Sequence, residues 1–510
     1  MRAEARRVVE RLRARRQAKG RPLSIAHRGA SAYATENTLT AFRRAALLGA
    51  DMWEVDVRVT RDGVPVACHD ERLRRLAGID DAIADTEWAD LAKVPLATGG
   101  TVPSLDQVID LARDTGTALY LDLKSPDAGE ASLGLLDRRG FDDAVLGERD
   151  PAAIDRLHRA GCPLPLSILV SVGADPFALA ARTALDMIHP CWEHASPTPQ
   201  DLLTPDLIAR AAAEDLDIIT WHEERPAILA DLVAMPVLGI CSDQPERVQP
   251  YRADPAGGRP LICCHRGANT IAPENTLAAA AAAYSQGVDI VEIDVRTTAD
   301  GTPVLMHDAT VDRTTDGSGA LSSLSDAEVT TLDAGGGFDP WFRGEAVPTL
   351  AAFLDAVPKG RGIYVEVKQA DAAAIVAQVR ARKLVNRAMF WTGDRALLRA
   401  LRDQGDDLRL MIPRTDVATL DEALDAWRAA IVQFLPDELN QAEIERCRAA
   451  GAQTMAWALG NDAAAIAHAL TFRPDIINTD RPDIVRRILE RDGRSPSQAV
   501  EVSRLVPGLA

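Results

Sequence analysis

The chain lacks any long apolar segment. Its 510 residues contain no run of about 18 apolar residues, the length needed to span a bilayer. The first 21 residues carry nine lysines or arginines against two acidic residues, but they include no apolar stretch and no small-residue cleavage site. A secretory signal is therefore not predicted, and we expect the protein to remain in the cytoplasm.

Positive charge and cysteine are also scarce. The 57 lysines and arginines are outnumbered by 75 aspartates and glutamates, and the net charge of −18 argues against a nucleic-acid partner. It does not exclude a phosphate-bearing substrate, because a bound metal ion can dominate the local field. Seven cysteines without framework spacing predict free thiols in a reducing compartment.

What the chain does contain is a repeat of domain length. Residues 27–70 and 265–308 align without a gap and share 24 of 44 positions, at an offset of 238 residues. More than half of the shared positions carry polar or charged side chains, among them both histidines and several acids. The repeat therefore predicts two tandem domains, each with its own copy of one site.

Short apolar runs alternate with helical periods in both halves, a pattern typical of parallel strands joined by helices. The predicted strands of the first half are 23–27, 52–57, 118–123, 143–147, 167–171, 185–189, 217–222 and 238–243. Those of the second half are 261–265, 289–295, 362–368, 387–392, 408–413, 430–435, 454–459 and 475–480. Eight βα units in roughly 230 residues predict an α/β fold of two tandem TIM (β/α)8 barrels, whose sites lie at the carboxyl ends of the strands.

The predicted boundaries follow from this pattern. We expect a basic N-terminal helix at 1–21, a first barrel at 22–252, a linker at 253–260, a second barrel at 261–491 and a tail at 492–510. The basic helix is either a solvated extension or a weak membrane-surface contact through Arg6, Arg7, Arg13 and Arg16.

Each half contains one hairpin and one long insertion. The turn sequences TRDG and TADG are too short for a parallel crossover and predict a hairpin that returns His69 alongside Asp56, and His307 alongside Asp294. The stretches 71–103 and 309–348, here called the cap segments, are too long and polar for βα loops. We expect each to form a small subdomain over the barrel mouth.

Acidic residues gather at predicted strand ends. Glu292 and Asp294 stand two residues apart on one strand and so share a face, and Glu366 ends the next strand. Glu54, Asp56 and Asp122 are their counterparts in the first half. Three oxygen ligands favour Mg or Ca over Zn. The alternative is that the acids form salt bridges with nearby basic residues, namely Arg58, Arg296, Lys124 and Lys368.

Two histidines flank each acidic group. His265 ends a strand and His307 ends the hairpin, with His27 and His69 as counterparts. One imidazole of such a pair can take a proton from a nucleophilic hydroxyl while the other gives one to a leaving alkoxide. Arg266 and Lys368, with Arg28 and Lys124 in the first half, supply cations that can hold a phosphodiester.

These motifs together resemble the glycerophosphodiester phosphodiesterase family. The resemblance rests on HRG, ENT, the E-x-D pair, DG, HD, E-x-K and the late AWALGND and NTDRP, and it covers both halves. It implies metal-dependent hydrolysis of glycerophosphodiesters, from lipid metabolism, to sn-glycerol 3-phosphate and an alcohol. It further implies that Glu274 and Asn275 shape the site, that Trp457 forms part of its wall, and that a neighbouring glycerol hydroxyl is the nucleophile.

The first half departs from this pattern. TENT replaces PENT, Asp122 replaces the third glutamate, RLRRLAGIDD replaces DRTTDGSG and TWHEERP replaces AWALGND. Three further histidines, His189, His194 and His222, lie near predicted strand ends, either in an altered leaving-group pocket or as packing and surface residues. The first barrel is thus either a second catalytic domain or a binding or regulatory module. A larger substrate, such as a lysophospholipid or a sugar-phosphate diester, is the other alternative.

Overall fold

The computed structural model describes residues 3–249 and 259–491, which belong to two compact units, 1–249 and 250–510. Each unit is described by itself. The predicted tail at 492–510 and most of the predicted linker lie outside the described residues. Those two boundaries therefore stay predictions.

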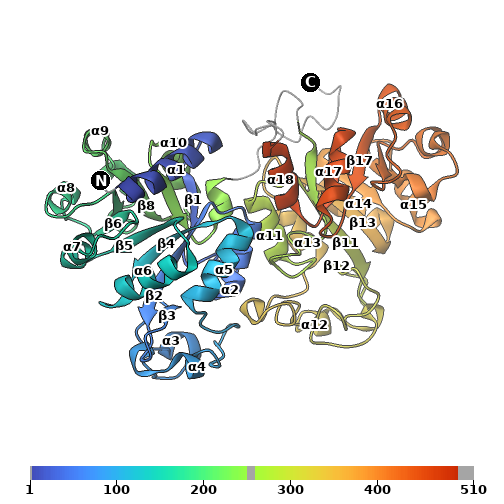
Figure 1. Ribbon diagram of the computed structural model, residues 1–510. Helices are drawn as coiled ribbons and strands as arrows, with labels where there is room; N and C mark the ends of the chain where they lie inside the picture. The colour runs from blue at the N-terminus through green and yellow to red at the C-terminus, as the bar shows by residue number, and fades with distance from the viewer. Residues whose placement is uncertain (1–2, 250–258, 492–510) are drawn as a thin grey trace. The chain divides into compact units, whose positions relative to one another are not determined.

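Eight parallel strands close into a barrel in the first unit (Figure 1). β1 pairs with β2 on one side and with β9 on the other, which completes the ring. The strands are β1 (Leu23–Ala26), β2 (Met52–Val59), β4 (Ala118–Leu123), β5 (Ala144–Glu148), β6 (Leu166–Val170), β7 (Met187–Pro190), β8 (Asp217–His222) and β9 (Gly239–Ser242). The surrounding helices are α2 (Leu39–Leu47), α5 (Leu105–Thr115), α6 (Ala128–Arg139), α7 (Pro151–Arg159), α8 (Pro176–Ala180), α9 (Pro205–Ala213) and α10 (Pro226–Ala234), with single turns η2 (Pro199–Leu202) and η3 (Pro245–Val248).

The second unit repeats this barrel. β10 pairs with both β11 and β18 and closes it in the same way. Its strands are β10 (Leu261–Cys264), β11 (Ile290–Thr297), β13 (Gly362–Gln369), β14 (Ala388–Trp391), β15 (Arg409–Pro413), β16 (Ile431–Phe434), β17 (Gln453–Trp457) and β18 (Ile476–Thr479). Its helices are α11 (Leu277–Ser285), α13 (Leu350–Ala356), α14 (Ala372–Ala381), α15 (Arg395–Arg402), α16 (Gln441–Ala449), α17 (Ala463–Thr471) and α18 (Pro482–Arg491), with turns η6 (Val385–Arg387), η7 (Arg414–Asp416) and η8 (Glu422–Ala426). The prediction of two tandem TIM barrels is confirmed.

The predicted hairpins are present. β3 (Pro65–Ala67) runs antiparallel to β2, and β12 (Pro303–Leu305) runs antiparallel to β11. The backbone N–H of Cys68 donates to the carbonyl of Asp56 at 2.9 Å, and that of Met306 donates to Asp294 at 3.0 Å. His69 and His307 thus each come one residue after the position that lies opposite the aspartate in the hairpin.

Each cap segment has a small hydrophobic core of its own. The first contains α3 (Arg74–Ala77), η1 (Ile83–Asp85) and α4 (Trp88–Leu91), and the second contains η4 (Leu321–Ser323), α12 (Asp326–Val329) and η5 (Pro340–Phe342). In the first cap Leu73, Ile83 and Leu91 are buried together, and in the second Val311 and Leu321 are. The two caps therefore fold alike although their sequences differ.

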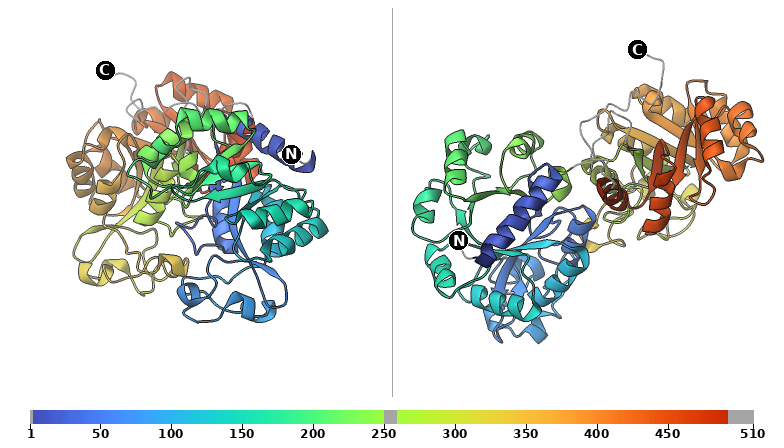
Figure 2. Two further views of the ribbon diagram at one scale, coloured as in Figure 1. Left: turned by 90° about the vertical axis from the view of Figure 1, so that its left-hand side faces the viewer. Right: turned by 45° about the horizontal axis from the view of Figure 1, so that its top comes forward.

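The N-terminal helix α1 (Ala3–Lys19) packs on the first barrel (Figure 2). Ala5, Val8, Val9 and Leu12 recur at helical spacing and are at most 2% exposed. Because these side chains need a partner surface, the helix is an integral layer of the first unit. No helix among the described residues has the length and apolar character needed to cross a bilayer.

Ion pairs fix α1 across the amino end of the barrel, opposite the rim that carries the predicted site. Arg13 pairs with Asp217, the first residue of β8, at 2.9 Å. Arg15 pairs with Asp143, just before β5, also at 2.9 Å. Arg13 is therefore engaged with the barrel, whereas the side chains of Arg6 and Arg7 are 60% and 69% exposed. The membrane-surface contact stays a prediction.

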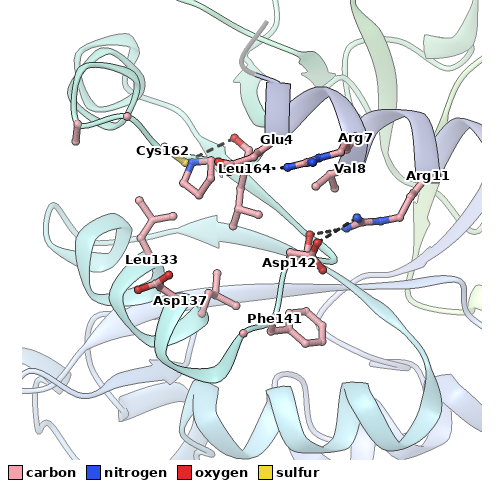
Figure 3. Close-up of a pocket in the computed structure, with 15 residues that line it drawn as sticks. Glu4, Arg7, Val8, Arg11, Leu133, Asp137, Phe141, Asp142, Cys162 and Leu164 are labelled. Atoms are coloured by element: carbon pink, nitrogen blue, oxygen red, sulfur yellow. Dashed lines mark hydrogen bonds and ion pairs between the residues drawn. The ribbon is translucent and has the colours of Figure 1, made fainter.

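A cavity of about 440 Å³ lies where α1 meets α6 and the turn after α7 (Figure 3). Val8, Leu133 and Phe141 contribute apolar walls, and Arg11 closes one side through a hydrogen bond to Asp142 at 3.1 Å. All seven cysteines are free, as expected, and Cys263 and Cys264 are buried in β10.

Replacing Leu12 by alanine tests the role of α1. Leu12 is 1% exposed, so Leu12→Ala removes buried apolar contacts and should destabilise the first unit by about 2–5 kcal/mol. Thermal or urea unfolding, followed by circular dichroism, measures the change. Arg7→Ala, at an exposed position of the same helix, is the control and should unfold like the wild type; equal unfolding of all three proteins would contradict the packing of α1.

Candidate active site

Three carboxylates meet at the carboxyl rim of the second barrel. β11 and β13 pair so that Asp294 is level with Glu366, and Glu292 shares the inward face of β11. Ligand oxygens of all three side chains lie within 4.8 Å of one another. The predicted acidic group is thus brought together on two adjacent strands.

Burial makes this group costly without a cation. Glu292 and Asp294 are each 1% exposed. Burial, together with the charges of Asp294 and Glu366, raises the pKa of Glu292 well above its ordinary value. Oε1 of Glu292 is buried and has no hydrogen-bond partner among the described residues. Three hard oxygen donors with one unsatisfied atom fit a divalent cation.

A lysine partly neutralises the acids. Nζ of Lys368 lies 3.3 Å from Oδ1 of Asp294 and also contacts Glu366. Arg296, in contrast, donates to the backbone carbonyl of His307 at 2.8 Å. The salt-bridge alternative therefore holds for the lysine, but one monovalent cation leaves the three carboxylates with excess negative charge.

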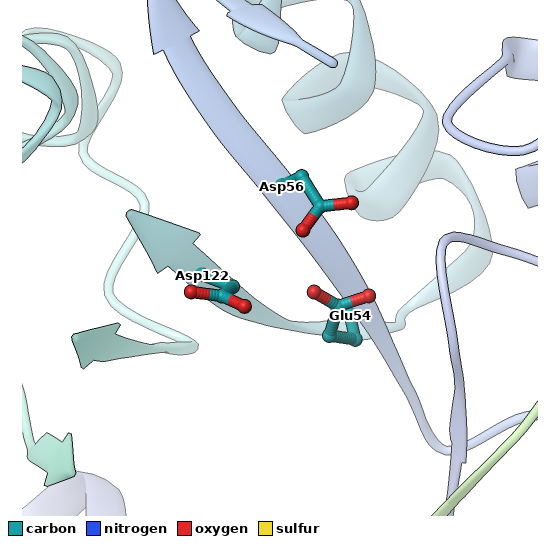
Figure 4. Close-up of side chains that lie close together, drawn as sticks. All are labelled: Glu54, Asp56 and Asp122. Atoms are coloured by element: carbon teal, nitrogen blue, oxygen red, sulfur yellow. The ribbon is translucent and has the colours of Figure 1, made fainter. Parts of the chain in front are cut away.

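The first barrel holds the same arrangement (Figure 4). Glu54, Asp56 and Asp122 lie within 4.8 Å of one another and are at most 7% exposed. Burial and the charge of Asp56 raise the pKa of Asp122 to about 6, despite Lys124. Burial also opposes ionisation of Asp56, but Lys124 and Arg28 outweigh it and lower the pKa of that carboxyl. This group likewise fits a divalent cation.

The HRG motif positions backbone close to the acids. Arg266 adopts a φ of 57°, unusual for a residue with a side chain, and its N–H donates to Glu292 at 2.7 Å. Gly267 follows at φ 78°, and a Cβ there would meet Ala279 of α11 at 2.8 Å. Arg28 and Gly29 repeat this conformation in the first barrel. The motif is therefore a tight turn that only glycine can complete.

The ENT motif links that turn to the carboxylates of the acidic group. Asn275 donates through Nδ2 to Asp294 at 2.8 Å and accepts from the N–H of Asp294 at 3.0 Å. Glu274 accepts from Arg266 at 3.0 Å, and Thr276 caps α11 by accepting from Ala279. Glu274 and Asn275 thus hold Arg266 and Asp294 in place, in line with the site-shaping role that the resemblance implies.

Both histidines of the second barrel are oriented by carboxylates. Nδ1 of His265 lies 2.8 Å from Asp480, and Nδ1 of His307 lies 2.6 Å from Asp308. Burial alone would raise the pKa of Asp480, but hydrogen bonds from His265 and other groups outweigh it and lower that pKa to about 2. The Asp480 carboxylate therefore accepts a hydrogen bond from Nδ1–H of His265. Nε2 of each ring is left for chemistry in the cavity.

Arg313 ties the cap segment to this machinery. It donates to Asp308 at 2.6 Å and to both oxygens of Glu274 at 2.8 and 2.9 Å. Because Asp308 orients His307 and Glu274 holds Arg266, one guanidinium couples the histidine to the arginine.

The first barrel preserves every link of this network. His27 contacts Asp243 at 2.7 Å, and His69 contacts Asp70 at 2.8 Å. Arg75 bonds Asp70 and Glu36 as Arg313 does its counterparts. Sequence reasoning missed these partners, namely Arg75, Arg313, Asp243 and Asp480. Both arginines stand five residues after the aspartate of the HD motif, which was the available signal.

A cavity of about 360 Å³ opens in front of the second site. Its lining includes the predicted residues His265, Arg266, Glu292, His307, Glu366, Lys368 and Trp457. Trp457 is 37% exposed and forms part of the wall, whereas Asn275 and Asp294 are buried behind it. The corresponding cavity of the first barrel is about 130 Å³. It is lined by His27, Arg28, Glu54, His69, Asp122 and Lys124, together with His189 and His222, but not by the exposed His194.

The fold and this rim define a TIM-barrel enzyme with a duplicated acidic, histidine-flanked site. Residues 27–247 and 265–484 both match the model of the glycerophosphoryl diester phosphodiesterase family, and the chain belongs to that family. The predicted resemblance is thereby confirmed.

Individual relatives cover one barrel or less. A Bacillus subtilis protein named as a candidate glycerophosphodiester phosphodiesterase is 45% identical over 107 residues, 21% of this chain and 44% of that protein. A glycerophosphodiester phosphodiesterase of Caldanaerobacter subterraneus is 27% identical over 238 residues, 44% of this chain and 95% of that protein. A crystal structure of the Agrobacterium tumefaciens glycerophosphodiester phosphodiesterase shows 35% identity, covers 44% of this chain and 98% of its own, and has a TM-score of 0.42.

Cation binding should depend on pH because the carboxyl groups must lose their protons first. Burial raises the pKa of Glu366 as well as that of Glu292, so protons compete at higher pH than for ordinary carboxyls. We expect the affinity for Ca²⁺ or Mg²⁺ to fall as the pH is lowered towards the raised pKa values of these carboxyl groups, with protons released on binding. Calorimetric titration in buffers of different ionisation enthalpy measures both, and a constant affinity without proton release would contradict the assignment.

Proposed function

We propose that the second barrel hydrolyses glycerophosphodiesters to sn-glycerol 3-phosphate and an alcohol, with Mg or Ca bound by Glu292, Asp294 and Glu366. The observation that carries this proposal is the pair of imidazoles, each held through Nδ1 by a carboxylate, on the wall of the cavity that contains the acids. When bound, the cation supplies positive charge that offsets the transition-state charge and lowers the pKa of a nearby hydroxyl.

The residues of the chain divide the remaining work. Arg266 and Lys368 line the same cavity and offer N–H donors to the phosphodiester oxygens. Nε2 of one imidazole removes the proton of the attacking hydroxyl, the neighbouring glycerol hydroxyl implied by the family. Nε2 of the other protonates the oxygen of the departing alcohol, which leaves a cyclic glycerol phosphate. Water then opens this ring, with the two imidazoles in exchanged roles, to give glycerol 3-phosphate. The base begins with a free lone pair on Nε2 and the acid with a proton on Nε2. Because a carboxylate holds Nδ1 of both rings, this geometry assigns neither role to a particular histidine.

Cavity size favours a small diester over a lysophospholipid. The exposed aromatic residue of the second cap, Phe338, is 41% exposed, but it is not part of the cavity lining. Trp391, Leu435, Trp457 and Leu459 contribute apolar surface to the lining of this cavity, whose volume is about 360 Å³. A diester of small polar alcohols, such as glycerophosphocholine, is therefore the preferred substrate. In keeping with the sequence, we also propose a cytoplasmic location.

Histidine variants test this assignment. In an assay of glycerophosphocholine hydrolysis with Mg or Ca, His307→Ala should reduce kcat by about 10²–10⁴-fold, the usual contribution of a general acid or base. His69→Ala, at the matched position of the first barrel, is the control and should leave most of the activity. Full activity of His307→Ala combined with loss of activity in His69→Ala would show that the first barrel, and not the second, hydrolyses the diester.

Removal of divalent cations should abolish hydrolysis. Three buried carboxylates cannot activate a hydroxyl by themselves, because their charge repels an anionic diester. Activity after treatment with a chelator, and its recovery with added Mg or Ca, is the measurement. Unchanged turnover in the chelator would overturn the metal assignment, and lysophosphatidylcholine as a parallel substrate tests the larger alternative.

A further inference from the structure

A β-bulge changes the mouth of the first barrel. β8 and β9 pair Ile219 with Gly239 and Thr220 with Ile240, but the next pair is His222 with Cys241. Trp221 is therefore skipped in the pairing of the two strands. β17 and β18 continue without such a shift, and Trp457 pairs with Asn478. One extra residue therefore brings His222 to the place that Trp457 takes in the second barrel, while Trp221 also contributes to the lining of the first cavity.

The bulge exchanges a tryptophan for a histidine. Trp221 is 1% exposed and packs with Ile168, Ile188 and Ile218 in the hydrophobic core. His222 instead stacks on His27, with ring centroids 4.5 Å apart and the planes 4° from parallel. In the second barrel the half-exposed Trp457 stands on the cavity wall at this place. One face of the His27 ring is thus covered by His222.

A second difference lies on β5, beside Asp122. Gly147 pairs with Asp122 where Trp391 pairs with Glu366. A Cβ on Gly147 would meet the hydroxyl of Tyr120 at 2.5 Å, so Tyr120 occupies that space. The same hydroxyl contacts Ser167 at 2.9 Å and His189 at 3.0 Å. These substitutions accompany the decrease in volume from about 360 to about 130 Å³.

The charge of the two mouths also differs. Besides the acidic group and the cationic side chains of Arg266 and Lys368, the second cavity is lined by the carboxylates of Asp416 and Glu438. The first is lined by Arg149 and Glu193. Arg149 follows the end of β5, and its guanidinium donates to the Ser171 hydroxyl at 3.2 Å. The first cavity thus offers a third cation and has one added carboxylate where the second has two, so the net charge of these added residues is 0 in the first cavity and −2 in the second.

We propose that the first barrel binds a small phosphate monoester of the glycerol phosphate class and excludes phosphodiesters. A monoester carries close to two negative charges at neutral pH and a diester one, which matches the additional cation. The small cavity accepts the glycerol phosphate portion but leaves no room for an alcohol beyond the phosphorus. This extends the proposed function, because such a monoester is the product class of the second barrel.

Calorimetric titration of the full chain tests the proposal. The background is His307→Ala, which slows turnover in the second barrel by the factor given above, with Ca²⁺ present throughout. We expect glycerol 3-phosphate to bind at a site that Arg149→Ala weakens about tenfold or more, the effect of losing one charge-assisted contact. Glycerophosphocholine should show no binding that Arg149→Ala alters. Arg159→Ala, an exposed arginine of α7, is the control and should change neither titration.

A second variant tests exclusion by His222. His222→Ala should open the first site and add a binding equivalent for glycerophosphocholine, whereas the exposed His194→Ala should not. The proposal is overturned if glycerol 3-phosphate binding is insensitive to Arg149→Ala, or if the unopened first site already binds the diester. Both titrations are independent of turnover. A wild type that fails to hydrolyse diesters would therefore contradict the proposed function and leave this inference standing. Thermal unfolding checks that each variant is folded.

Discussion

Mutual repulsion among three buried carboxylates governs the rim of each barrel. Side chains such as Glu292 and Asp294, almost wholly removed from water, cannot all remain ionised unless positive charge lies between them. The surrounding structure supplies part of that charge through Lys368 and backbone N–H groups, of which that of Arg266 is one. The remaining deficit is what makes the rim a place for a divalent cation and, through it, for an anionic ester.

The positions of these acids depend on motifs that look separate in the sequence. A turn with a left-handed residue and a glycine, an asparagine in the left-handed region and a helix cap form one continuous structure beneath the carboxylates. Arg313 then joins this structure to the cap segment and to His307 through Asp308 and Glu274. The site is therefore a network. Some residues shared by the two repeats, such as Glu274 and Asn275, hold another side chain in place and do not line the cavity themselves.

Much of this was accessible from sequence. Strand positions, barrel closure, the hairpins and the acidic residues follow from hydrophobic runs and from spacing, because they are set by local periodicity. The partners Asp243 and Asp480 were missed because they come from the last strand of each barrel, more than 200 residues from the histidines that they orient. Arg75 was missed because the cap sequence around it differs from that around Arg313, although both arginines stand five residues after the aspartate of the HD motif. The docking of α1 was misread as optional because its basic residues were weighed more heavily than its apolar stripe.

The bulge at Trp221 carries a lesson about how duplicated domains diverge. Side chains alternate along a strand, so one unpaired residue exchanges the inner and outer neighbours without altering the chemistry of either. A column-by-column alignment would pair Trp221 with Trp457 and report an identity at the very place where the two barrels differ most. Strand phase, as well as residue type, thus decides which ring lies against His27 in this chain, and comparisons among tandem barrels should read it from backbone pairing.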